Sequence, residues 1–256
     1  TWLPIAGTSL GYASTITSMA RDRKAYYSNV YDALSRPTFV SSPGEDMQGK
    51  GKRKEYGTND GNSVKKYRFS SGGIVGNSFY EKGELRMERI TDEEGATLET
   101  YTDLLGNKVL ERHDGDNDTY YIYNDAGLLT YVLQPMFQEE ENLDKFSFRY
   151  TYDDRGRMVS KILPGCGLVS YTYDEANRVI SMQDGEMRKK GKVRHYEYDN
   201  QDRLVTQYTD GIGGKTYEIH NYYDGDYSFV PSGLPNCKDN YSSSANDANL
   251  ARGLLC

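Results

Sequence analysis

Aromatic and polar residues alternate along much of this chain with the two-residue period of a β-strand. The clearest run is KFSFRYTYD over residues 145–153, where one face carries Phe146, Phe148, Tyr150 and Tyr152. Shorter runs repeat the alternation, at Val169, Tyr171 and Tyr173, at Tyr196 and Tyr198, and at Tyr217, Ile219 and Tyr223. Helical spacing appears nowhere over a comparable length. The pattern therefore predicts a meander of short antiparallel strands between about residues 84 and 227.

A turn signal separates these strands and keeps returning along the chain. An Asp or Asn stands at the same place in seven similar segments, at Asp32, Asp103, Asn124, Asp153, Asp174, Asp199 and Asp224. After a first gap of 71 residues, the separations are 21, 29, 21, 25 and 25 residues, which is the length of one β-hairpin. An Asp or Asn that opens a tight turn accepts a hydrogen bond from a backbone N–H two residues further on. The repeat therefore predicts tandem hairpins.

The residue three places after each turn aspartate is one that tolerates a left-handed backbone. These residues are Gly106, Gly127, Gly156, Asn177 and Asp202. A type I turn followed by a left-handed residue is a common hairpin connection, so the chain varies the residue and keeps the conformation. The segment DEEG, residues 92–95, has the same spacing without the tyrosine, whereas Ser35 departs from the pattern and weakens the prediction for the first turn.

The segments YTYDDRGRMVSK, YTYDEANRVISM and YEYDNQDRLVTQ resemble the YD repeat of the RHS (rearrangement hot spot) proteins. That repeat is roughly Tyr-Asp-x-x-Gly-Arg-Leu, and the longer string DGDNDTYYIYNDAGLLTYVLQP is similar to large RHS-repeat proteins of Bacteroidetes-type bacteria. The copies depart from it at Ser35, Asn107 and Leu128. The resemblance implies a long β-sheet coiled into a hollow shell, as in the shell proteins of insecticidal toxin complexes, where it encloses a C-terminal effector, and in the teneurin ectodomain.

The resemblance also implies a function for the chain. We expect a non-catalytic segment of a β-shell wall in a large surface or exported protein whose remaining repeats and C-terminal effector are its partners. The RHS-associated core of the family has no match here. The alternative is a cell-surface adhesion module that binds carbohydrate through exposed tyrosines. Tyrosines buried under a second sheet layer would favour the wall, and an open concave aromatic face would favour adhesion.

The predicted fold is all-β, a curved, open sheet of antiparallel hairpins. Residues 1–78 would hold a first strand pair (25–43) and a loop-rich insertion (44–78), residues 79–227 the YD-repeat sheet, and residues 228–256 an irregular tail. The first two dozen residues show no clear pattern. An open sheet has unpaired strands at its ends, so we also expect some edge-to-edge self-association.

Composition narrows the classes of partner. The chain has 31 Lys and Arg against 38 Asp and Glu, a net charge of −7, which is the wrong sign for a nucleic-acid binder. No run approaches 18 apolar residues, so no transmembrane segment is expected. Basic residues gather at KGKRK (50–54) and at Lys65–Lys66, which we interpret as a solvated insertion rather than a phosphate-binding loop.

Residues with catalytic or metal-binding potential are scattered. Cys166, Cys237 and Cys256 are an odd number at wide spacing, which leaves their redox state open. His113, His195 and His220 fit no metal-binding spacing, and the last two fall in strand-like runs. The acidic string 114–118 lacks the glycine of a calcium loop and precedes a predicted strand, so we interpret it as a turn. We expect no catalytic residue, no cofactor site and no metal site.

The turn model predicts the effect of single substitutions. We expect Gly156→Val to lower the free energy of unfolding by about 1–3 kcal/mol, because a β-branched residue is strained at positive φ. By the same reasoning, Asn177→Gly is expected to be nearly neutral. Denaturant unfolding of both variants measures this, and an unchanged midpoint for Gly156→Val would contradict the turn model.

Overall fold

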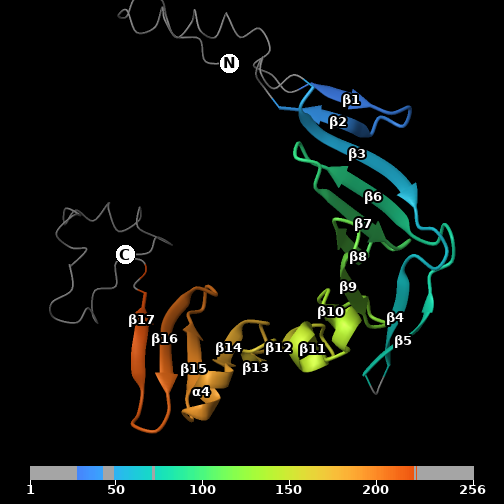
Figure 1. Ribbon diagram of the computed structural model, residues 1–256. Helices are drawn as coiled ribbons and strands as arrows, with labels where there is room; N and C mark the ends of the chain where they lie inside the picture. The colour runs from blue at the N-terminus through green and yellow to red at the C-terminus, as the bar shows by residue number, and fades with distance from the viewer. Residues whose placement is uncertain (1–27, 43–48, 71–72, 222, 224–256) are drawn as a thin grey trace, which may run out of the picture. The chain divides into compact units, whose positions relative to one another are not determined.

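The computed structural model describes residues 28–42, 49–70, 73–221 and 223, and they form an all-β structure (Figure 1). In the first part of the chain the strands are β1 (Asn29–Tyr31), β2 (Pro37–Ser41), β3 (Gly51–Thr58), β4 (Lys65–Ser70), β5 (Gly73–Phe79), β6 (Arg86–Thr91), β7 (Thr97–Thr102), β8 (Lys108–His113), β9 (Asn117–Tyr123) and β10 (Leu129–Leu133). The second part holds β11 (Ser147–Tyr152), β12 (Met158–Leu163), β13 (Gly167–Tyr173), β14 (Val179–Gln183), β15 (Val193–Tyr198), β16 (Leu204–Asp210) and β17 (Thr216–His220). Three short helices are α2 (Phe137–Glu140), α3 (Leu143–Phe146) and α4 (Gly185–Lys189).

The strands make an antiparallel meander. One sheet has 15 strands in the order β1-β2-β3-β6 and then β7 to β17 in sequence, and β4 and β5 pair separately. The sheet is not closed: β1 and β17 are its two end strands. The predicted fold class, a meander of antiparallel hairpins in an open sheet, is confirmed. Among the described residues, no helix has the length and apolar character that crossing a membrane would need.

The chain divides into two compact units, residues 1–147 and 148–256, which are described separately. The domain boundaries at residues 78 and 227 stay predictions. The seventh motif copy at Asp224, the tail 228–256, Cys237, Cys256 and the first two dozen residues lie outside the described residues.

The prediction of a loop-rich insertion over residues 44–78 is wrong for the part that the structure describes. Residues 51–54 of the basic run KGKRK belong to strand β3, and β4 and β5 form a hairpin. Charge and glycine hid the strand period, but charges on the neighbouring strand balance those of β3. Lys54 pairs with Glu88 at 2.8 Å and Glu55 with Arg89 at 3.2 Å.

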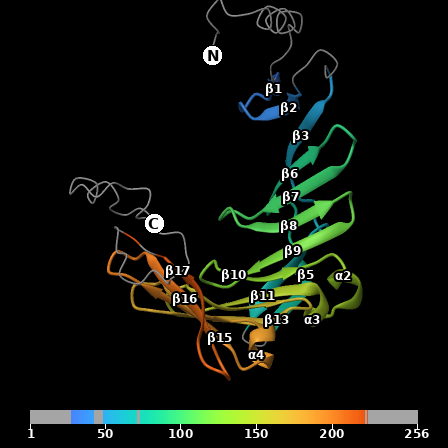
Figure 2. The same ribbon diagram turned by 90° about the vertical axis from the view of Figure 1, so that its left-hand side faces the viewer.

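The hairpin β4–β5 covers part of one face of the sheet in the first unit, where β4 packs against β9 (Figure 2). Beneath it, an apolar row crosses five paired strands, formed by Met87, Tyr101, Leu110, Tyr120 and Leu133. The ring of Tyr67 from β4 meets that of Tyr120 edge-on, with 5.0 Å between centroids. The hairpin and this row form the main hydrophobic core, completed by Val64, Leu85, Val109, Ile122 and Phe137.

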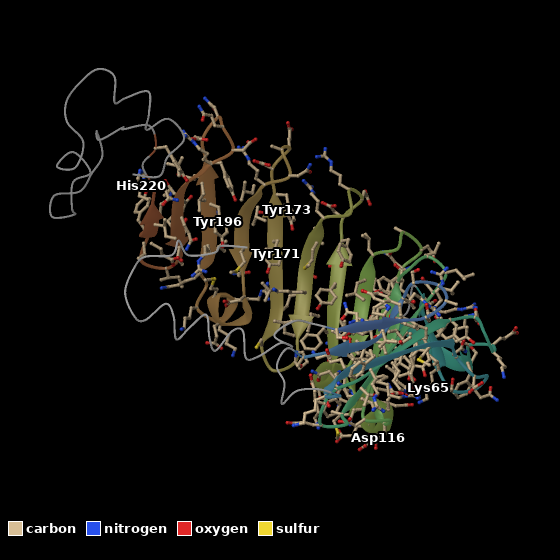
Figure 3. All side chains as sticks on the ribbon, turned by 90° about the horizontal axis from the view of Figure 1, so that it is seen from above. Lys65, Asp116, Tyr171, Tyr173, Tyr196 and His220 are labelled. Atoms are coloured by element: carbon tan, nitrogen blue, oxygen red, sulfur yellow. The ribbon has the colours of Figure 1, made fainter. Side chains whose placement is uncertain are left out.

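The second unit carries its aromatic residues differently. The pairing of β13, β14 and β15 places Tyr171, Met182 and Arg194 in one row, with Tyr196 on the same face (Figure 3). These side chains are half-buried by their neighbours, and among the described residues of this unit no second sheet layer covers them. Tyrosines therefore lie under another layer in the first unit, as at Tyr120, and on an uncovered sheet in the second.

The apolar row predicts where truncation is costly. Leu110 is fully buried, so Leu110→Ala should lower the free energy of unfolding by about 2–5 kcal/mol through lost burial and the cavity left behind. Leu105 is 87% exposed at a turn, and Leu105→Ala should change stability by less than about 0.5 kcal/mol. Urea unfolding of the two variants measures the contrast, and equal midpoints would contradict this assignment of the core.

Candidate functional site

The recurring turns are built as the sequence predicts. Asp153 Oδ1 accepts hydrogen bonds from the backbone N–H groups of Arg155 (3.0 Å) and Arg157 (2.9 Å). The N–H of Gly156 donates to the carbonyl of Asp153 at 2.9 Å, and Gly156 has φ +75°. Positive φ values at the same place are found at Gly106, Gly127, Asn177 and Asp202. The predicted left-handed turn residues are confirmed.

The first turn shares this geometry, although the residue three places after its aspartate is a serine. Ser35 has φ +62°, and Asp32 Oδ1 accepts from the N–H groups of Leu34 (2.8 Å) and Arg36 (2.9 Å). The weakening of the turn prediction at Ser35 was wrong. The carboxylate of Asp32 closes the loop through backbone groups, and this holds a small side chain in the left-handed region.

An arginine four residues after the aspartate adds a second bond to each of four turns. Its Nε donates to the other carboxylate oxygen, at 2.7 Å for Arg36, Arg157 and Arg178 and at 2.6 Å for Arg203. The pKa of Asp153 is lowered, first by the backbone hydrogen bond from Arg157 and also by its guanidinium. The pKa values of Asp32, Asp174 and Asp199 are lowered as well, so the aspartates of these four turns are ionised acceptors and not proton donors.

The same arginines connect each hairpin to the next one. Arg157 Nη1 donates to the carbonyl of Asp174 (2.9 Å) and to Oδ1 of Asn177 (3.0 Å). Its guanidinium lies over the ring of Tyr173, 4.9 Å from the centroid. The hydroxyl of Tyr173 donates back to the carbonyl of Met158 at 2.7 Å. Aspartate, arginine and the tyrosine of the following hairpin thus form one linked unit, which we call a rung.

Rungs recur along the sheet. Arg178 bonds the carbonyl of Asp199 (3.3 Å) and Oδ1 of Asp202 (2.7 Å), and it lies 5.0 Å from the ring centroid of Tyr198. Tyr56, Tyr123, Tyr198 and Tyr223 donate to backbone carbonyls as Tyr173 does. Because the strands are antiparallel and consecutive, the turns that begin at Asp153, Asp174 and Asp199 lie at the same end of the strands, and the other connections of the second unit lie at the opposite end. Tyr123, Tyr173 and Tyr198, each of which precedes a turn Asp or Asn, are therefore part of the connections between hairpins.

A second polar arrangement, which the sequence analysis missed, crosses the first unit. Paired strands place charges of alternating sign side by side, in the order Glu55, Arg89, Glu99, Arg112 and Asp118. We call this set the charge row. Arg89 contacts Glu99 at 2.6 Å and Arg112 contacts Asp118 at 2.6 Å. Only knowledge of the strand register would have revealed it, because the five residues are spread over 64 positions from residue 55 to residue 118.

Glu99 is the most buried member of the charge row, with 6% of its surface exposed. Burial acts to raise its pKa, but the hydrogen bonds from Tyr101 (2.7 Å) and Arg89 outweigh this, so the pKa of Glu99 is lowered. Burial and the neighbouring carboxylate raise the pKa of Tyr101 to about 12. Both groups therefore keep their usual protonation at neutral pH, as in a structural network.

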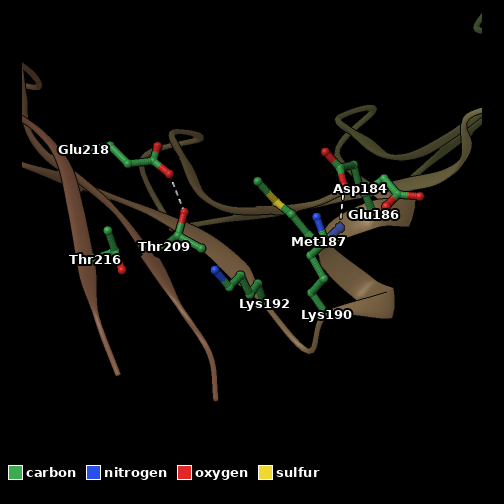
Figure 4. A pocket seen from close by; sticks show the side chains of 8 residues that line it. All are labelled: Asp184, Glu186, Met187, Lys190, Lys192, Thr209, Thr216 and Glu218. Carbon is green, nitrogen blue, oxygen red and sulfur yellow. Dashed lines mark hydrogen bonds between the residues drawn. The ribbon is translucent and has the colours of Figure 1, made fainter. Parts of the chain in front are cut away.

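In the second unit, an open cleft of about 320 Å³ lies beside α4, lined by Asp184, Glu186, Met187, Lys190, Lys192, Thr209, Thr216 and Glu218 (Figure 4). Its carboxylates already have partners: Asp184 caps α4 through the N–H of Met187 (2.7 Å), and Glu186 binds Lys189 (2.7 Å). Glu218 accepts from Thr209 (2.5 Å), which, with Gln207, lowers the pKa of Glu218. A carboxylic acid that acts as a general acid at neutral pH needs a raised pKa, whereas the pKa values of Glu186 and Glu218 are lowered.

The remaining candidate residues are held by local contacts. His113 lies 3.1 Å from Glu111, the ring of His195 stacks on Tyr208 at 5.1 Å, and His220 contacts Thr206 at 3.2 Å. His195 and His220 lie in strands, as predicted. In the acidic string, Asp114 accepts from the N–H of Thr97 while Asp118 faces Arg112. Within the described ranges, no three His, Cys, Asp or Glu side chains gather in an arrangement that would hold a metal ion.

Comparison with known proteins gives structural matches alone. No family model matches the chain, and no curated protein matches it. A Photorhabdus luminescens Tc holotoxin pore with a mutated TccC3 is 16% identical, with a TM-score of 0.44 over 80% of this chain and 10% of that chain. A TcdB2-TccC3-TEV structure is 15% identical, with a TM-score of 0.45 over 77% of this chain and 11% of that one. This chain therefore spans about a tenth of the length of the chains it matches.

The charge row predicts a defined pH dependence. Because the folded-state pKa of Glu99 is lowered, its ionised form stabilises the fold above the ordinary value of 4.5, and this contribution is lost as the pH falls through the lower folded-state pKa. Glu99→Gln should therefore cost about 1–3 kcal/mol at pH 7 and progressively less below pH 4.5. Urea unfolding at several pH values measures the difference. Glu94→Gln, at an exposed turn position, is the control, and a pH-independent cost for Glu99→Gln would contradict the assignment.

Proposed function

We propose that this chain is a non-catalytic structural segment of a large RHS/YD-repeat protein, exported or held at the cell surface. In that protein it would form part of the wall of a β-shell that encloses or presents a C-terminal effector. The observation that carries the proposal is the series of rungs through which Arg157 and Arg178 join consecutive hairpins of the second unit.

Rungs suit a wall because they act between nearest neighbours. Each one is completed by the following hairpin, so the structure extends by adding hairpins without altering those already present. The end strand β17 is exposed along its length, and unpaired strand edges are normally covered by further structure. Further repeats of the same polypeptide would supply that cover.

The chemistry of the rungs also favours a structural role. The Asp, Arg and Tyr side chains that could act in catalysis are engaged in turns and connections, as at Asp153, Arg157 and Tyr173. The cleft beside α4 has paired carboxylates with lowered pKa values, at Glu186 and Glu218. These contacts support a structural role for the segment.

The wall proposal predicts protection of the effector by intact rungs. In the full natural polypeptide, the C-terminal region should resist proteinase K. The double variant Arg178→Ala/Tyr198→Ala, which removes one rung, should speed its digestion several-fold. A matched double variant, Lys190→Ala/Lys192→Ala, lies at the end of the strands opposite the rungs in the same unit and should leave the digestion rate unchanged. Equal digestion in all three proteins would contradict the enclosure.

A second candidate, carbohydrate binding, is favoured by the uncovered tyrosine face of the second unit. Tyr171 and Tyr196 share that face with Arg194, and aromatic rings beside a polar group are suited to stacking on sugars. On a glycan array, Tyr171→Ala/Tyr196→Ala should abolish any binding, whereas Tyr217→Ala, on the other face, should not. An array without bound glycan would remove this candidate and leave the wall proposal untouched.

A further inference from the structure

The residue three places after each turn Asp or Asn differs between repeats, although its backbone conformation does not. Gly127, Gly156, Asn177 and Asp202 all have φ between +63° and +76°. Glycine adopts this region without strain, whereas Asn and Asp adopt it at some cost. Conformation alone therefore does not account for Asn and Asp at two of the four turns.

Which residue stands at this position correlates with the last residue of the preceding turn. Where the preceding turn ends in arginine, the next turn has a side-chain acceptor: Arg157 is followed by Asn177 and Arg178 by Asp202, at 3.0 and 2.7 Å. Where the preceding turn ends in another residue, the next turn has glycine: Asn107 is followed by Gly127 and Leu128 by Gly156. All four consecutive turns from residue 124 to residue 202 obey this rule. The first turn lies outside it: Arg36 is followed in the series by Gly106, but strands β3 and β6 separate these two hairpins.

The side-chain chemistry explains the rule. A guanidinium directed at the next turn meets one backbone carbonyl there, and an Asn or Asp oxygen gives it a second, charge-assisted acceptor. Asn107 has a shorter side chain than arginine, and its amide already donates to Asp103 at 3.0 Å within its own turn. It therefore offers no donor to the next turn. Without a donor from the preceding turn, an Asn would bring strain and no bond, so glycine is preferred.

We propose that these two positions form a neighbour code. An arginine four places after the aspartate of one turn selects a hairpin whose own turn carries Asn or Asp three places after its aspartate. Repeats of similar sequence can pair in the wrong order or register, because their strands are alike. The code makes correct neighbours more favourable than incorrect ones. The partner it recognises is a further hairpin of this type, and the inference stands on the fold whether or not the chain encloses an effector.

The code is tested by building a new rung where the chain lacks one. In the first unit, Asn107→Arg and Gly127→Asn would install the missing pair, and no atom lies within 4 Å of a Cβ added at Gly127. We expect Gly127→Asn alone to lower the melting temperature and the double variant to recover it. The melting temperature of the double variant should lie about 2–4 °C above the value expected from the sum of the two single changes.

The control uses the same residue types with the wrong neighbour. Asn107→Arg combined with Gly106→Asn places the acceptor in the arginine's own turn, and its effects should simply add. In the second unit, Arg157→Leu and Asn177→Gly should be non-additive, because either change breaks the same bond. With Arg157 present, Asn177→Gly is therefore expected to lower the melting temperature, whereas the turn conformation alone predicts a nearly neutral change. Additive effects at 107/127 and at 157/177 would overturn the code, and each cycle is informative if a variant of the other fails to fold.

Discussion

A carboxylate that closes a tight turn from within is the interaction on which the rest of this sheet depends. Asp153 holds two backbone N–H groups with one oxygen and the Arg157 guanidinium with the other. That second bond aims the arginine at the next turn and at the ring of Tyr173. Surface ion pairs contribute little individually, at most about 1 kcal/mol. Their effect here comes from repetition, because each rung orients the hairpin that carries the next one.

The two units use the same turns but stabilise their sheets differently. In the first, the hairpin β4–β5 covers an apolar row that includes Leu110 and Tyr120, and the charge row beside it satisfies Glu99 and Arg112. In the second, strands β11–β17 form a single described layer whose tyrosines are half-buried by their neighbours. Core burial dominates one unit, and connections between adjacent strands dominate the other.

Connections between adjacent hairpins account for much of the Asp, Arg and Tyr content of the described chain. Asp, Arg and Tyr are abundant because the rung requires all three, and their pKa values move toward permanent charge at Asp153 and permanent neutrality at Tyr173. A site for proton transfer needs the opposite tendency. The proposed wall function and the neighbour code both follow from this use of charged side chains as connectors.

The sequence by itself determined the strand alternation over residues 147–152 and the left-handed turns at Gly156 and Asn177, because those features depend on residues within four positions of each other. The predicted start of that strand at residues 145–146 is wrong, because these residues end helix α3. Tertiary structure alone decided that residues 51–54 of the basic run lie in a strand and that Asn177 is chosen for the arginine twenty residues before it. It also assembled Glu99, Arg112 and Asp118 into one row. Each of these outcomes depends on a partner from another strand or turn, and only the register of the sheet specifies which residues meet.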